Sequence, residues 1–100
     1  MTRIDAFVPD LMDRSRFGNR ANLVKLADLS ASTADLVLVD LRPAEVLGSL
    51  PTGAGRVIGF APHVDDELLA AASEAGCDEA LPRSLFFRRL PELLAGDGVG

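Results

Sequence analysis

The sequence predicts an α/β fold in which a parallel β-sheet lies between two layers of helices, a three-layer α/β/α sandwich. Residues 36–39, Leu-Val-Leu-Val, form an apolar run without polar alternation, which is typical of a strand buried on both faces of a parallel sheet. Short apolar runs alternate along the chain with helical segments. Such a series of β-α units requires right-handed crossovers and therefore parallel strands with helices on both faces.

Five strands are expected. The first ends before Pro9, because proline cannot donate to a sheet ladder. The second is short, which favours an edge position. The expected order is 2-1-3-4-5, the flavodoxin-like arrangement, whose ligand crevice lies where the first and third strands end. Asp10 and Asp40 follow those strands and are expected to meet there. The predicted strands cover residues 4–8, 22–25, 36–39, 56–60 and 79–81.

A helical segment is expected after each strand. Asp10 is suited to cap the first helix. The fourth helix has the clearest pattern, because its apolar residues recur at helical spacing and Gly76 follows at the position of a C-terminal cap. Ser84 is expected to cap the last helix, and Pro91 to kink it. The predicted helical segments cover residues 11–19, 27–32, 43–47, 64–75 and 85–94.

The composition indicates one domain, residues 1–95, followed by a flexible tail, residues 96–100. The net charge of −5 argues against a nucleic-acid partner. No apolar stretch reaches membrane-spanning length, and the N-terminus has no apolar signal core, so we expect no membrane association. A single cysteine, Cys77, and a single histidine fit a reducing, cytoplasmic location and close no structural zinc site.

Three short segments carry a resemblance to a known family. Residues 39–40, Val-Asp, end the third strand, and residues 75–78, Ala-Gly-Cys-Asp, precede the fifth. Residues 81–84, Leu-Pro-Arg-Ser, lead into a helix of apolar and basic residues. In order and spacing, the chain resembles a response-regulator receiver domain, the phosphoacceptor module of two-component signalling. The similarity covers about residues 4–95, with shortened second and third helices.

The resemblance implies roles for individual residues. Asp40 matches the aspartate that accepts the phosphoryl group, and Asp10 matches a ligand of Mg²⁺, with Asp40 and the backbone carbonyl of Arg42 as further ligands. Pro9 replaces the first acidic residue of the family's pair. Arg83 replaces the family's lysine, and we expect it to form an ion pair with the acids of the pocket, Asp40 among them. By its residues alone, Asp10 is better explained as a helix cap.

The chain also departs from the family's pattern. Ala61 stands in place of the hydroxyl that detects the phosphoryl group, Ala80 in place of the aromatic switch residue, and Ser84 in place of a proline. We therefore expect a degenerate receiver, a non-catalytic signalling or protein-interaction module that requires no cofactor. The alternative is a working Mg²⁺-dependent phosphoacceptor, which at most phosphorylates itself at Asp40 from a phosphodonor.

The expected partner is another protein or a second copy, bound through the fourth helix, the fifth strand and the fifth helix. The residues proposed for this face are Phe86, Phe87, Arg88, Arg89 and Leu90. Basic residues after the first strand, Arg14, Arg16 and Arg20, are expected on a solvated helix face, with a phosphate or partner patch as the alternative.

Residues 63–67, His-Val-Asp-Asp-Glu, support a third interpretation. They resemble the His-Pro-Asp-Asp-Glu metal motif of zinc-dependent N-deacetylases, although Val64 replaces the proline and no second histidine follows. A small metal-dependent hydrolase centred on His63, with Asp66 and one more acid as further ligands, would explain them. The simpler explanation is a helix that begins with acidic residues at its positive end.

Overall fold

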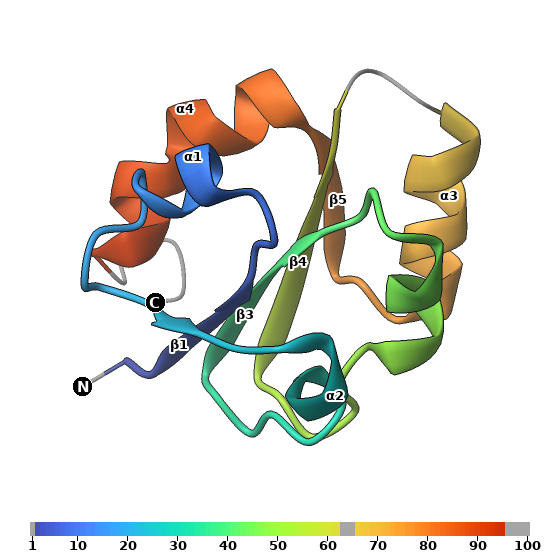
Figure 1. The fold of residues 1–100 in the computed structure, drawn as a ribbon. Helices are drawn as coiled ribbons and strands as arrows, with labels where there is room; N and C mark the ends of the chain where they lie inside the picture. The colour runs from blue at the N-terminus through green and yellow to red at the C-terminus, as the bar shows by residue number, and fades with distance from the viewer. Residues whose placement is uncertain (1, 63–65, 96–100) are drawn as a thin grey trace.

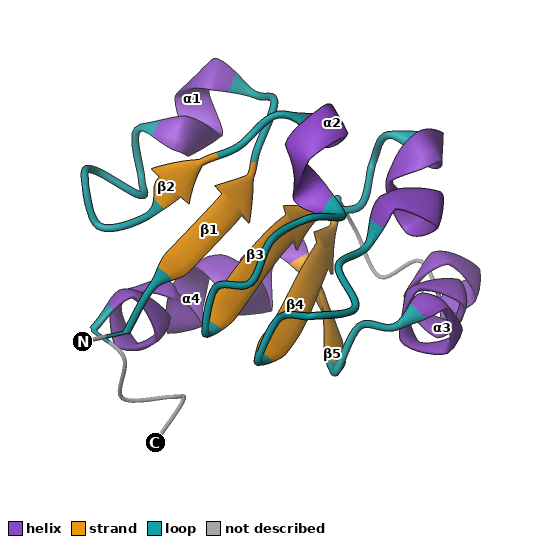
Figure 2. Ribbon diagram, turned by 90° about the horizontal axis from the view of Figure 1, so that it is seen from below, coloured by secondary structure: helices purple, strands orange, loops and turns teal. Residues whose placement is uncertain are grey.

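The computed structural model describes residues 2–62 and 66–95. Its strands are β1 (Ile4–Phe7), β2 (Asn22–Leu23), β3 (Leu36–Asp40), β4 (Arg56–Ala61) and β5 (Glu79–Pro82). They form a five-stranded sheet of order β2-β1-β3-β4-β5, and every neighbouring pair is parallel (Figure 2). The predicted α/β class and the flavodoxin-like order 2-1-3-4-5 are confirmed. The predicted tail, 96–100, and residues 63–65 lie outside the described residues.

The helices form the two outer layers. Figure 1 shows α1 and α4 on one side of the sheet and α2, η1 and α3 on the other. The helical segments are α1 (Leu11–Arg14), α2 (Leu26–Leu29), the 3-10 helix η1 (Ala44–Ser49), α3 (Asp66–Ala75) and α4 (Arg83–Leu94).

Several helix boundaries differ from the prediction: the second segment, predicted over 27–32, is α2 (Leu26–Leu29), and the third, predicted over 43–47, is η1 (Ala44–Ser49). The first helix ends at Arg14 and not near residue 19, and Gly18 then adopts a positive φ of 59°, which an L residue rarely adopts and which does not continue a helix. The last helix begins at Arg83, so Ser84 lies inside its first turn and is not its cap. Pro82 holds the cap position and supplies no side-chain hydrogen bond.

The core is built on both faces of the sheet, as the apolar run of β3 predicted. Leu36 and Leu38 face the α1–α4 layer, whereas Val37 and Val39 face the α2–η1–α3 layer. All four side chains are fully buried. Because both faces of this strand are covered, its sequence shows no polar alternation.

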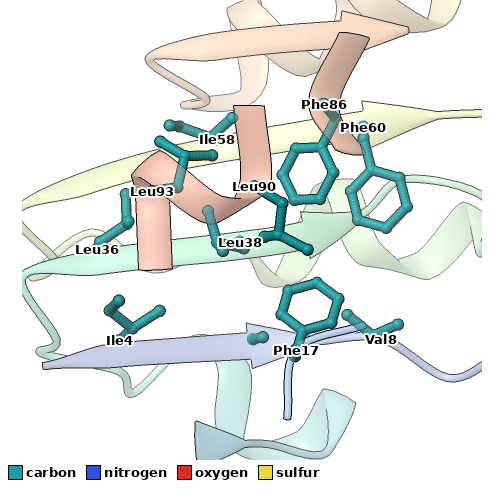
Figure 3. Close-up of a cluster of buried hydrophobic side chains, with 11 residues drawn as sticks. Ile4, Val8, Phe17, Leu36, Leu38, Ile58, Phe60, Phe86, Leu90 and Leu93 are labelled. Atoms are coloured by element: carbon teal, nitrogen blue, oxygen red, sulfur yellow. The ribbon is translucent and has the colours of Figure 1, made fainter. Parts of the chain in front are cut away.

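Aromatic rings fix the start of α4 over the sheet. The ring of Phe86 stacks on that of Phe60 in β4, with 4.3 Å between the centroids, and packs near Phe17 (Figure 3). Phe87 meets these rings edge-on. Aromatic pairs of this geometry are favourable beyond their buried area. They hold the first turn of α4, and with it Arg83, beside the carboxyl end of the sheet.

Candidate functional site

Three carboxylates and two arginines lie together where β1 and β3 end. Asp10 precedes α1, Asp13 lies within α1, and Asp40 is the last residue of β3. The Nη2 atom of Arg42 lies 2.7 Å from Asp40, 3.5 Å from Asp13 and 3.8 Å from Asp10. Arg83 joins the group through Asp13. The predicted residues Asp10, Asp40 and Arg83 are therefore in one cluster, but Asp13 and Arg42 connect them.

Both carboxylate oxygens of Asp40 are occupied by the side chain of Arg42, two residues further along the chain. Its side chain is 1% exposed, and Arg42 donates to both of its oxygens, from Nε at 3.1 and 3.2 Å and from Nη2 at 2.7 Å. The backbone N–H of Arg42 adds a hydrogen bond of 3.0 Å. The side-chain hydrogen bond to Asp40 raises the pKa of the Arg42 guanidinium. A bidentate pair of this kind is among the stronger interactions of protein side chains.

Asp13 forms the second ion pair of the cluster. It is buried, and Arg83, 70 residues away in the chain, donates to both of its oxygens. The hydrogen bond from Arg83 lowers the pKa of the Asp13 carboxyl, although burial opposes this shift. The same hydrogen bond raises the pKa of the Arg83 guanidinium. Arg83 therefore pairs with an acid of this cluster, as expected, but that acid is Asp13, and Asp40 pairs with Arg42 instead.

Asp10 serves as the cap of α1. Its Oδ1 accepts the backbone N–H of Met12 at 2.8 Å and that of Asp13 at 3.1 Å. Capping by an aspartate satisfies amides that have no partner inside the helix. Its other oxygen faces Arg42.

The oxygens in this cluster do not fit Mg²⁺ as the sequence resemblance implied. Magnesium requires free oxygen ligands in octahedral geometry. Here both oxygens of Asp40 and both of Asp13 accept from arginines, and Asp10 divides its oxygens between the cap and Arg42. Among residues 2–62 and 66–95, no group of three or more His, Cys, Asp or Glu is arranged to hold a metal. The guanidinium of Arg42 supplies positive charge at this position.

The positions that differ from the receiver pattern are placed as follows. Ala61 ends β4, is fully buried and lies beside Pro82 of β5. Ala80 lies in β5 and packs against the core beneath α3. Pro9 and Ser84 are exposed. Neither alanine carries a hydroxyl or a ring toward Asp40.

The predicted interaction face is wrong in part. Phe86 and Leu90 point into the core, because they follow the inner side of α4, and are buried. Phe87 is half-buried, and Arg89 is paired with Glu79 at 2.7 Å. Of the five residues, Arg88 alone is exposed. For the hydrolase interpretation, His63 lies outside the described residues, and Asp66 is exposed at the start of α3.

The sequence analysis did not identify two side chains of the cluster, those of Asp13 and Arg42. Asp13 and Phe17, four residues apart in the segment after β1, are both buried. That spacing could have identified it. Arg42 could have been identified because it lies two residues after Asp40, close enough for its side chain to pair with that carboxylate at the end of β3.

Comparisons with known proteins identify the fold. No family model matches the chain, and no curated protein matches its sequence. A solved structure of the CpaE2 pilus assembly protein from Sinorhizobium meliloti 1021 has a TM-score of 0.59 and 20% identity, over 97% of this chain and 98% of that one. The pilus assembly protein CpaE from Caulobacter crescentus CB15 has a TM-score of 0.57 and 16% identity, over 92% of both chains. None of the described helices is long and apolar enough to cross a membrane. At these identities, the comparisons show that the chain shares its flavodoxin-like fold with these proteins.

Proposed function

We propose that this protein is a degenerate receiver-like module that acts by binding another protein, and not by phosphotransfer. The observation that carries the proposal is the pairing of Asp40 with Arg42. A nucleophilic carboxylate needs a free oxygen facing the phosphorus atom, and phosphoryl transfer needs cations that offset the charge on the phosphoryl group. Both oxygens of Asp40 are instead bound by a guanidinium of the same chain.

The residues around Asp40 also lack a means of responding to a phosphoryl group. A bound group changes a protein's conformation only if it binds two conformations with different affinity. Ala61 and Ala80 offer methyl groups where the receiver family has a hydroxyl and an aromatic ring. Their side chains make no polar contact that a phosphoryl group could strengthen.

The surface beside the cluster supports a binding role. Leu11 and Met12, at the start of α1, are 75% and 82% exposed. Two adjacent, large apolar side chains in water are unfavourable unless a partner covers them. The solved structures with the same fold are of proteins described as pilus assembly proteins. A multiprotein assembly in which Leu11 and Met12 contact a neighbouring protein is the setting we propose.

The absence of phosphotransfer is tested by incubating the protein with acetyl phosphate and Mg²⁺ and measuring its intact mass. We expect no gain of a phosphoryl group. An Asp40→Asn variant is the matched control, because it keeps the shape of the side chain. A phosphoryl mass that appears in the native protein and is lost in this variant would overturn the proposal.

The binding role is tested by co-purification from the native host after chemical cross-linking. A Leu11→Ser, Met12→Ser variant is expected to lose a cross-linked species that the native protein forms. Leu23→Ser is the matched control, since Leu23 is also exposed but lies in the edge strand β2. Equal loss in both variants, or no loss in either, would exclude the α1 surface as the contact.

A further inference from the structure

A second site lies next to the acid cluster, at the start of α4. A cavity of about 470 Å³ opens between the turn after α1 and the first turn of α4. Its volume is in the range of sites that take small molecules. Seven residues line it, and three of them are arginines, Arg16, Arg83 and Arg88. Of the described residues that line it, none is acidic, in a chain whose net charge is −5.

Two of these arginines have no ion-pair partner among the described residues, although the charge of Arg16 contributes to lowering the pKa of Asp13. Arg83 is neutralised by Asp13. Arg16 and Arg88, in contrast, form no ion pair with any carboxylate among the residues that the structure describes. Both are exposed, so water reaches them and an incoming anion can replace that water. The site therefore offers two guanidiniums without an ion-pair partner among the described residues, beside a third that is paired with Asp13.

The aromatic ring of Phe87 contacts two of the three arginines. The Cζ atoms of Arg16 and Arg83 each lie 4.7 Å from the centroid of its ring. The ring itself is held edge-on by Phe17, Phe60 and Phe86. Contact with an aromatic ring stabilises a guanidinium, so one fixed ring holds two like charges near each other. The ring therefore places Arg16 next to Arg83 at the wall of the cavity.

The cavity also presents neutral donors. The hydroxyl of Ser84 is exposed at its wall. The first turn of the twelve-residue helix α4 forms the same wall, and Pro82 provides no side-chain acceptor for its amides. These groups add to the arginines, which alone provide the charge.

We propose that this cavity binds a phosphate group, either free or carried by a small molecule. Guanidinium groups match the oxygens of a phosphate in pairs of hydrogen bonds, and Arg16 and Arg88 are available for such pairs. The ring of Phe87 is engaged by arginines, so the ligand is recognised by its phosphate and not by stacking. The inference does not depend on Asp10 or Asp40, so a failure of the proposed function would leave it unaffected.

The test is a titration of the native protein with inorganic phosphate, followed by NMR at the amides of Ser84 and Arg88 and at Nε of Arg16. Sodium chloride at equal ionic strength is the reference. We expect saturable shifts with phosphate and none with chloride. A second titration compares glycerol 3-phosphate with inorganic phosphate. Tighter binding of the ester assigns the site to a phosphorylated small molecule, and equal binding assigns it to free phosphate.

Variants locate the site. Arg16→Gln and Arg88→Gln are each expected to weaken phosphate binding by about tenfold or more, as the loss of a charge-assisted pair predicts. Arg20→Gln is the matched control, because Arg20 is exposed and lines the neighbouring apolar cavity instead. Circular dichroism checks that each variant is folded. The proposal is overturned if phosphate shifts do not saturate, or if Arg20→Gln weakens binding as much as the other two substitutions.

Discussion

Replacing Arg42 by alanine is the most informative perturbation of the acid cluster. The substitution removes the side-chain donors to both oxygens of Asp40 and leaves that carboxylate with the backbone N–H of residue 42, at 3.0 Å. It also removes the cation that lies 3.5 Å from Asp13. A buried carboxylate without its partner is strongly destabilising.

The magnitude follows from the burial of the two groups. Breaking a fully buried ion pair costs about 3–5 kcal/mol. Asp40 is fully buried, but the Arg42 side chain is 39% exposed, so water can enter beside the carboxylate and the cost is reduced to about 2 kcal/mol. For a domain of this length, that value corresponds to a decrease in Tm of about 8–16 °C.

Urea denaturation followed by circular dichroism measures this change. The double variant Arg42→Ala, Asp40→Asn is expected to recover part of the loss, because the uncompensated charge is gone. Arg88→Ala is the control and is expected to change stability by less than about 0.5 kcal/mol, since Arg88 forms no described ion pair. A loss in Arg42→Ala no larger than that of the control, or no recovery in the double variant, would refute this reasoning.

Three further predictions concern buried groups. The hydrogen bond from Arg83 lowers the pKa of Asp13 below its ordinary value of 3.8, so the stability that this pair contributes is fully present above that pH and is lost as the pH falls below it. Urea denaturation between pH 2 and pH 5 should show this loss in the native protein, and a smaller slope in Asp13→Asn; equal slopes would contradict it. Phe86→Ala should destabilise the protein by about 3–5 kcal/mol in the same assay, because Phe86 is fully buried, whereas a surface role would predict almost no change. Burial raises the pKa of the Cys77 thiol to about 11, so alkylation by iodoacetamide at pH 8 should be on the order of a hundredfold slower in the folded protein than in urea, and equal rates would exclude a buried thiol.

The sheet could be predicted from the sequence because burial on both faces leaves a direct trace in composition. β3 is apolar at every position before Asp40, since Leu36 and Val37 face opposite cores. The helices were harder to place. The helix after β1 is a single turn, Leu11–Arg14, which is too short to show an amphipathic pattern. The positive φ of Gly18, which prevents the helix from continuing, cannot be read from such a pattern either.

The position of the site could also be predicted from the sequence, but the pairing of its acids and arginines could not. Asp40 and Arg83 follow strands, and topology brings the ends of parallel strands together. The choice of ion-pair partners depends on side-chain conformations, which cannot be deduced from the spacing of residues in the sequence. Arg42 forms an ion pair with Asp40, and Arg83 forms one with Asp13, a residue that the sequence pattern did not identify.

The most direct measurement of the central claim, that arginines of this chain close the acid cluster, is a Mg²⁺ titration of the native protein followed by NMR at the amides of Asp10, Asp40 and Arg42. The account predicts no saturable shift at these amides. Saturable shifts at Asp10 and Asp40 in the native protein would show that the carboxylates are open to a metal ion, and would contradict it.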